Sequence, residues 1–524
     1  MAVELIKDII KVDQLVGENT LQAMIEGDIL APDTKPDITR IVAVEGGIQL
    51  TKQETQEDKI AVEGNLRFKV LYVSDKGDEP LYSIDSSTEF KDHIAIQGLT
   101  SQMKNQVKAE LEHIDFNLNN ERKVGIKAVI NLEGKGLEAK SISITQDLEG
   151  IEDIEILSET LQYTDVVGTN ISHTLVKETF QLEENQEEIR EVLQCHGIVL
   201  EKETKITDGK MIIGGDVLLD VLYIGEDVEM GIKRMKQEMP FTYFIEMPGI
   251  YSDMTYRLKM NVGDIYTDIK EDLDGERKIL EVEAIVNVDV NIMELQERQI
   301  LLDAYSPNQP LALTKEKIQF KERIGVYSSQ VLLRENLDIP SNSPPMVEVF
   351  SVTGRAVVTD YNILDNKIML EGILETTAIY NSEAEAQSIY SYMQEIPFRH
   401  HIEIEGLRGE MEVDIQLLVQ DLDYNKINEE QIELRINLGS ICEVNCNKYI
   451  DFVSNVEELL EEVDLVKRPS LTVYFFQEGD SLWKIAKRYH TTVQEIMEGN
   501  EIQDPGDVKV GDQIMIEKVY NFNF

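Results

Sequence analysis

The stretch KMIIGGDVLLDVLY, residues 210–223, decides the fold, because the chain contains essentially the same phrase three times. The other two copies are KIAVEGNLRFKVLY at residues 59–72 and KIMLEGILETTAIY at residues 367–380. Each copy has a glycine five residues after its lysine and a tyrosine eight residues after that glycine. In every copy a second glycine lies 18 residues before the first, and a phenylalanine lies 18 residues after the tyrosine. Anchors that keep one frame in three places indicate an internal repeat.

The spacing of the copies indicates that each repeat is a domain. Gly64, Gly215 and Gly372 are 151 and 157 residues apart. A unit of about 150 residues buries roughly 68–70% of its unfolded surface and can fold around its own core, whereas a solenoid repeat of about 20–50 residues cannot. We therefore predict three homologous domains, followed by a helical linker and a small C-terminal module, with boundaries at residues 1–160, 161–312, 313–454, 455–470 and 471–518.

Alternation of apolar and polar residues predicts that the repeats consist mainly of β-strands. In the first copy Leu66, Phe68 and Val70 alternate with basic residues, which places one face of a strand on a core. A glycine inside such a strand favours a bulge or a close approach of a neighbouring segment. Several strands separated by Asn, Asp and Gly turns favour an antiparallel, β-sandwich-like fold over a parallel α/β fold.

Three segments depart from this strand pattern and predict helices. The first lies at the N-terminus, and the second is ENQEEIREVL at residues 184–193. The third follows the last repeat, with apolar residues at i, i+3, i+4 and i+7 and a stop at Pro469, and predicts an amphipathic hinge or docking helix. The apolar positions of the first helix are Leu5, Ile6, Ile9 and Ile10, and those of the third are Val456, Leu459, Leu460 and Val463.

Composition and charge narrow the possible partners. The chain has 99 acidic and 50 basic residues, a net charge of −49, with an ordinary hydrophobic content of 42%. So acidic a chain is a poor ligand for nucleic acid or anionic lipid, because affinity for phosphates rests on Lys and Arg. The N-terminus lacks a secretory pattern, no apolar run is long enough to cross a membrane, and the three cysteines suit a reducing compartment. We expect a cytosolic protein without membrane insertion.

The C-terminal module has its own pattern of short elements. Val473 begins a short strand, and Asp480 after Gly479 is predicted to cap a helix whose buried stripe contains Leu482, Ile485, Ala486 and Tyr489. Thr492 and Glu495 form a capping box for a second helix that ends at Gly499–Asn500. Alternating residues around Ile514 and Ile516 then predict a closing strand. The expected order of elements is βααβ.

The residues that could carry chemistry do not form a recognisable catalytic or metal-binding pattern. The His400–His401 pair points to opposite faces of a strand, and Cys442 and Cys446 would lie about 13 Å apart on one strand face. The sequence has no GxxxxGK[ST] phosphate loop and no GxSxG motif. We therefore predict no catalytic residues, no metal and no cofactor.

The C-terminal segments GDSLWKIAKRY, TTVQEIMEGN and VKVGDQIMI closely resemble a LysM domain. LysM domains bind N-acetylglucosamine-containing glycans such as peptidoglycan, in a groove between the loop before the first helix and the loop after the second. The resemblance places this groove at Gly479, Asp480, Ser481, Asn500, Glu501, Ile502 and Gln503. Glu501 stands where the family commonly has proline or a small residue, so a carboxylate is expected beside the groove.

Three repeats before one LysM domain resemble the clostridial spore-coat morphogenesis proteins of the SipL type, whose repeats are called SPOCS domains. The resemblance implies a non-enzymatic scaffold or adaptor in the mother-cell cytosol, at the surface of the forespore, that couples coat assembly to the basement-layer ATPase of the coat. Partner contacts are predicted at Trp483, an aromatic anchor, and at the basic residues Lys484, Lys487 and Arg488 of the first helix. The alternatives are that Trp483 only packs on its own domain, and that the chain binds peptidoglycan or is a LysM-targeted glycan enzyme.

Overall fold

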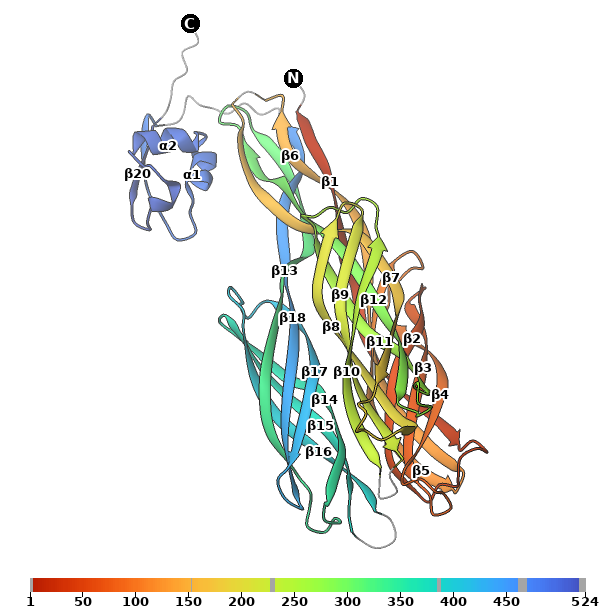
Figure 1. The fold of residues 1–524 in the computed structure, drawn as a ribbon. Helices are drawn as coiled ribbons and strands as arrows, with labels where there is room; N and C mark the ends of the chain where they lie inside the picture. Colours follow the sequence, from red (N-terminus) through yellow and green to blue (C-terminus); the bar gives the residue numbers. More distant parts are fainter. Residues whose placement is uncertain (1–2, 152, 227–230, 384–387, 460–468, 518–524) are drawn as a thin grey trace.

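The structure is a computed structural model that describes residues 3–151, 153–226, 231–383, 388–459 and 469–517. Within these residues three elongated β repeats lie side by side, and the C-terminal module (residues 471–517) lies at one end (Figure 1). At that end the first and last strands of each repeat continue as a long antiparallel two-stranded ribbon.

Each repeat contains six strands in the same order. Repeat 1 consists of β1 (Glu4–Leu30), β2 (Arg40–Gln56), β3 (Lys59–Val73), β4 (Tyr82–Ala95), β5 (Lys104–Asn120) and β6 (Lys123–Glu149). Repeat 2 consists of β7 (Glu155–Gln181), β8 (Ile189–Thr207), β9 (Lys210–Gly225), β10 (Ile232–Glu246), β11 (Thr255–Lys270) and β12 (Ile279–Tyr305). Repeat 3 consists of β13 (Leu311–Asp338), β14 (Glu348–Leu364), β15 (Lys367–Asn381), β16 (Ile389–Glu403), β17 (Glu412–Lys426) and β18 (Gln431–Glu458).

The strands of each repeat pair into two three-stranded antiparallel sheets that enclose a core. In repeat 1 the orders are β2-β3-β4 and β1-β6-β5, and the other two repeats use the equivalent orders. Alternate residues of the central strands point inward, as Ile60, Val62, Leu66 and Val70 do in β3. The predicted fold class, mainly β with three homologous sandwich-like repeats, is confirmed.

The three repeated glycines occupy equivalent positions, opposite a phenylalanine on the next strand. An added Cβ on Gly64 would lie 2.6 Å from the Phe90 ring and 2.7 Å from the carbonyl oxygen of Gln49. The neighbouring strand shifts register by one residue at this point in each repeat. The predicted bulge and close approach are therefore both present, in the pairs Gly64–Phe90, Gly215–Phe241 and Gly372–Phe398.

Two of the predicted helices are wrong, and the reason is strand pairing. The N-terminal segment is strand β1, in which Ile10 and Val12 are buried while Ile9 is 62% exposed. Pairing with β6 along nearly its whole length overrides the helical spacing. Residues 184–193 form a turn followed by the start of β8, where Ile189 is fully buried.

The predicted linker helix at 455–470 is wrong at its start. β18 continues to Glu458, and Val456 is buried where the ends of the long two-stranded ribbons meet. Leu460 and Val463 lie outside the described residues. β7 begins at Glu155 and β13 begins at Leu311, a few residues before the predicted repeat boundaries at 160 and 312.

Besides the smaller cluster around Val456, two apolar clusters join the repeats to one another. One lies between the sheets that carry the repeated phrases, and the other lies between the long two-stranded ribbons. The first contains Val42, Ala43, Leu71, Val73, Leu81, Leu193, Leu222, Ile224, Ile232, Phe350, Ile379 and Ile389. The second contains Ile10, Val12, Ile144, Leu161, Tyr163, Ile300, Ile318, Phe320 and Phe452. Because each cluster draws on all three repeats, their burial holds the repeats together.

Basic side chains also connect the repeats, and several of them reach a bulged strand of the neighbouring repeat. Arg67 of repeat 1 binds the carboxylate of Asp264 and donates to the carbonyl of Gly263 at 3.0 Å, both beside the β11 bulge. Arg355 of repeat 3 donates to the carbonyls of Leu111 and Glu112 beside the β5 bulge. A bulge leaves backbone groups without a ladder partner, and the guanidinium groups satisfy them.

The third contact closes a ring of repeats. Lys236 of repeat 2 lies 2.6 Å from Asp421 and donates to the carbonyl of Leu422 at 3.2 Å, beside the β17 bulge of repeat 3. Repeat 1 thus binds repeat 2, repeat 2 binds repeat 3, and repeat 3 binds repeat 1. This head-to-tail arrangement is the one that closes a ring in a cyclic oligomer, built here within one chain.

The C-terminal module has the predicted βααβ order, with a short 3₁₀ turn added. Its elements are β19 (Leu471–Phe475), α1 (Leu482–Tyr489), α2 (Val493–Gly499), η2 (Pro505–Asp507) and β20 (Gln513–Glu517). The Thr492–Glu495 capping box is present, and α2 ends at Gly499 with Asn500 as its C-cap. The predicted stripe of α1 is confirmed at Leu482, Ile485 and Ala486, which are buried.

Candidate functional site

The turn before α1 is held by side chains of the module itself. The Asp480 carboxylate accepts from the Tyr474 hydroxyl at 2.7 Å and from the Gln477 amide at 2.9 Å. The prediction that Asp480 caps the helix is wrong, because Ser481 accepts from the Lys484 amide instead. Asp480 is thus used to fix the turn, in which Gly479 has a φ of +84°.

The loop after α2 has a similar internal lock. The Asn500 side chain donates to the carbonyls of Ile496 and Met515 at 2.7 Å each, and its oxygen accepts from the Met515 amide. These bonds join α2 to β20. Glu501 follows with a φ of +55° and an exposed side chain.

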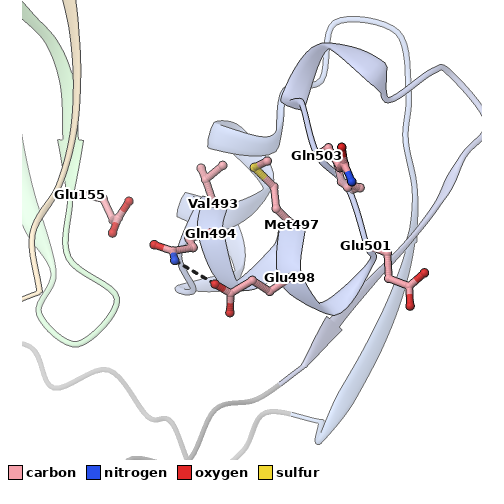
Figure 2. A pocket seen from close by; sticks show the side chains of 8 residues that line it. Glu155, Val493, Gln494, Met497, Glu498, Glu501 and Gln503 are labelled. Atoms are coloured by element: carbon pink, nitrogen blue, oxygen red, sulfur yellow. Dashed lines mark hydrogen bonds between the residues drawn. The ribbon is translucent and has the colours of Figure 1, made fainter.

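A shallow pocket of about 540 Å³ lies on α2 and this loop (Figure 2). Its apolar lining is Val493, Met497 and Ile502, and its polar lining is Glu155, Gln494, Glu498, Glu501 and Gln503. It brings together Glu501, Ile502 and Gln503 of the predicted groove. Gly479, Asp480, Ser481 and Asn500 are not among the residues that line it.

Repeat 2 contributes one residue to this pocket. Glu155, at the start of β7, faces α2 across the pocket in Figure 2. Burial raises the pKa of Glu155, and the nearby charge of Glu495 adds to the effect. The pocket therefore lies where the C-terminal module meets repeat 2.

Two of the predicted partner-binding residues contact repeat 2 within the same chain. Trp483 donates from Nε1 to Oδ2 of Asp303 at 2.9 Å, and Lys487 Nζ lies 2.6 Å from Oδ1 of the same carboxylate. Tyr305 packs edge-on against Trp483 with ring centroids 4.9 Å apart, and its hydroxyl donates to the Thr491 carbonyl at 2.9 Å. Tyr305 is only 5% exposed and belongs to the core of the module.

The other two predicted residues remain on the module. Lys484 donates to the carbonyl of Gly479 at 2.8 Å, and the Arg488 guanidinium lies 5.8 Å from the centre of the Tyr489 ring. Of the four predicted residues, Trp483 and Lys487 thus bind repeat 2. The contacts of Lys484 and Arg488 described above lie within the module.

The contact with repeat 2 changes the titration of its acidic member. Burial opposes the charge of the Asp303 carboxylate, but hydrogen bonds from Lys487 and Trp483 and the charge of Lys315 outweigh it, so the pKa of Asp303 is lowered. Burial and nearby carboxylates raise the pKa of Tyr305. Asp303 therefore stays ionised and Tyr305 stays a hydrogen-bond donor at neutral pH.

A second cavity, of about 1360 Å³, lies between the three repeats. At its wall His196 Nε2 of repeat 2 lies 3.0 Å from Oε2 of Glu45 of repeat 1, and Gln194 donates to the same carboxylate. Burial disfavours the charged ring, but the Glu45 carboxylate outweighs it, so the pKa of His196 is raised. The sequence does not predict this pair, although Glu45 and His196 stand at equivalent places, directly before Gly46 and Gly197, the glycines 18 residues before the central glycine of each phrase.

The residues considered for metal or redox chemistry are dispersed. In the part of the chain that the structure describes, no three His, Cys, Asp or Glu side chains are grouped to hold a metal ion. Burial raises the pKa of Cys195 to about 12 and of Cys442 to about 11, which favours unreactive thiols. Among the described residues, the helices are too short or too polar to span a membrane.

Comparison with known families covers both parts of the chain. Residues 37–119, 188–270 and 345–427 match the SipL, SPOCS domain family, and each match spans the second to fifth strands of one repeat. Residues 474–517 match the LysM domain family. No curated protein and no solved structure matches the chain significantly. The chain belongs to the SipL-type family, with three SPOCS domains followed by a LysM domain.

Proposed function

We propose that this protein is a non-enzymatic scaffold or adaptor in the assembly of the bacterial endospore coat. The proposal places it in the mother-cell cytosol, at the surface of the forespore, and assigns its localisation to protein binding by the LysM domain. The family membership supports a role in sporulation.

The observation that carries the proposal is the way the chain joins its domains. Arg67, Lys236 and Arg355 close the three repeats into a ring, and Asp303 and Tyr305 seat the LysM domain on the end of repeat 2. An adaptor needs surfaces held in a fixed relation, and these contacts provide it. Such an adaptor binds its partners through its surface, and the loops and sheet edges of three diverged repeats provide different binding surfaces.

The proposed partners are the basement-layer ATPase of the coat and other coat proteins. The basic residues of α1 stand out in a chain with a net charge of −49, so an acidic surface of a partner fits them. Trp483 is the chain's only tryptophan and lies among them. Tryptophan and basic residues contribute strongly to protein interfaces.

A second candidate function is the binding of N-acetylglucosamine-containing glycan. The pocket on α2 favours it, because Val493, Met497 and Ile502 offer an apolar floor and Gln494 and Gln503 offer amide groups beside it. Apolar floors with a few polar groups are typical of small-ligand sites. The surrounding carboxylates Glu155, Glu498 and Glu501 disfavour anionic glycans.

The localisation of the protein in sporulating cells tests the proposal. We would follow fluorescent fusions of the full chain and of the chain ended at Ser470 in a spore-forming host that lacks its own copy. The expected result is a shell around the forespore for the full chain and diffuse mother-cell signal without the LysM domain. The same shell for both chains would contradict localisation by LysM. Titration of the full chain with chitin oligomers tests the second candidate.

A further inference from the structure

The segment of repeat 2 that binds the LysM domain resembles a bound peptide more than a domain interface. Asp303, Ala304 and Tyr305 form the last extended residues of β12. The carboxylate binds Trp483 and Lys487, and two residues later the tyrosine ring enters the LysM core. One acidic and one aromatic side chain thus supply the polar bonds of this contact, in an arrangement typical of short linear motifs.

This segment is special to repeat 2, although its backbone is not. All three long two-stranded ribbons have a register shift near their ends, and Asp147, Asp303 and Asn455 follow this shift at equivalent positions. Two residues later the repeats have Glu149, Tyr305 and Glu457. Repeat 2 alone therefore combines the carboxylate with an aromatic ring.

We propose that the α1 face of the LysM domain is a recognition site for an extended Asp-x-Tyr segment, and that Asp303–Tyr305 occupies this site within the chain. The LysM domain is thereby latched to repeat 2. A partner that carries an acidic residue and an aromatic residue two positions later, in an extended segment, competes for the same face. This part rests on the proposed function, in which Trp483 and Lys487 serve an external protein.

The arrangement has a clear consequence for affinity. While the latch is closed, Trp483 and Lys487 are not free for a second ligand, and only the fraction of molecules with an open latch can bind one. The apparent affinity for a competing segment falls by that fraction. Weakening the latch from the side of repeat 2 therefore strengthens binding of an external segment at α1.

The only tryptophan of the chain lies in the latch, so its fluorescence reports the latch directly. We would compare the full chain with the variant Asp303→Ala/Tyr305→Ala and with Lys487→Glu, which alters the LysM side alone. Both are expected to shift the emission to longer wavelength and to raise acrylamide quenching. Lys484→Glu, on the same helix but bonded to Gly479, is the matched control and is expected to leave both readings unchanged.

A peptide of residues 301–309, LLDAYSPNQ, tests recognition in trans. The double variant is expected to bind it at least about tenfold more tightly than the native chain, with Trp483 protected again from acrylamide, because its own segment no longer competes. A peptide with Asp303→Ala and Tyr305→Ala is expected not to bind.

Unchanged quenching in the double variant and in Lys487→Glu would overturn the latch, and so would equal peptide binding by the native chain and the double variant. Neither result depends on localisation at the forespore. If these tests show no latch but localisation depends on the LysM domain, this inference alone is refuted. If they show the latch but localisation does not depend on the LysM domain, the proposed function alone is refuted.

Discussion

Replacing Gly64 with alanine tests the repeated phrase at its central residue. The added Cβ would lie 2.6 Å from the Phe90 ring and 2.7 Å from the carbonyl oxygen of Gln49, both closer than a real Cβ contact. The phenyl ring can turn, but the carbonyl belongs to a paired strand and moves only with the backbone. The strain must therefore be relieved by a backbone shift.

The expected cost follows from two opposing contributions. Overpacking a well-packed site costs about 1–3 kcal/mol. Alanine is otherwise favoured over glycine inside a strand by roughly 0.5–1 kcal/mol. We expect Gly64→Ala to lower the free energy of unfolding by about 1–2 kcal/mol, since the steric cost exceeds the gain. For a unit of this size that corresponds to a fall in melting temperature of roughly 2–4 °C per kcal/mol.

Gly47→Ala on the neighbouring strand is the matched control. An added Cβ there meets no atom within 4 Å, so only the favourable contribution remains. Differential scanning calorimetry of the full chain should show a lower melting temperature for Gly64→Ala and an unchanged or higher one for Gly47→Ala. Equal shifts in the two variants would refute the steric reasoning. Gly215→Ala and Gly372→Ala should behave as Gly64→Ala does. A Cβ added at Gly215 would lie 2.7 Å from the carbonyl oxygen of Leu200, and one added at Gly372 would lie 2.8 Å from that of Val357.

Three further predictions concern the repeat contacts and the LysM core. The raised pKa of His196 means that its pair with Glu45 stabilises the protein fully below the ordinary histidine value of about 6.5 and less as pH rises through the higher folded pKa. As pH rises over this range, the melting temperature of the native chain should therefore fall more than that of His196→Gln. The same dependence of melting temperature on pH in both proteins would contradict a stabilising His196–Glu45 pair. Arg67→Ala should cost about 1–2 kcal/mol, because it leaves Asp264 and a bulge carbonyl without their donor; an unchanged denaturation midpoint would argue against the ring contact. Leu482→Asp should unfold the LysM domain, because a buried carboxylate costs several kcal/mol and a core this small supplies only a few. Protection of the module from protease in that variant would show that the α1 register is wrong.

Local patterns in the sequence were enough to predict the β repeats and most of the LysM domain. The fixed frame around Gly215 and the alternation in Leu66, Phe68 and Val70 depend on neighbours within one strand. The Thr492–Glu495 capping box depends on residues three apart. These features depend on residues that are close together in the chain, so a single sequence is enough to predict them.

Contacts between distant residues decided the features that the sequence did not predict. The N-terminal segment looks helical by spacing, but β6, more than 100 residues later, pairs with it and makes it a strand. Asp480 looks like a helix cap, but the Tyr474 hydroxyl and the Gln477 amide draw its carboxylate into the turn.

The latch is the clearest case in the candidate site. The chemistry of Trp483 and Lys487 predicts that they bind a partner, but Asp303, which they contact in this chain, lies 180 and 184 residues away. No local pattern connects these positions. A comparison of the three repeats offered one signal, since Tyr305 stands where the other copies have glutamate.

Binding of the purified basement-layer ATPase to the full chain tests the central claim most directly. Isothermal titration would compare the native chain with Trp483→Ala, and chitin oligomers would be titrated in parallel. The adaptor role predicts that the ATPase binds the native chain, that Trp483→Ala weakens this binding at least about tenfold, as expected for an aromatic interface anchor, and that sugar binds weakly or not at all. Tight sugar binding, together with ATPase binding that Trp483→Ala leaves unchanged, would contradict it.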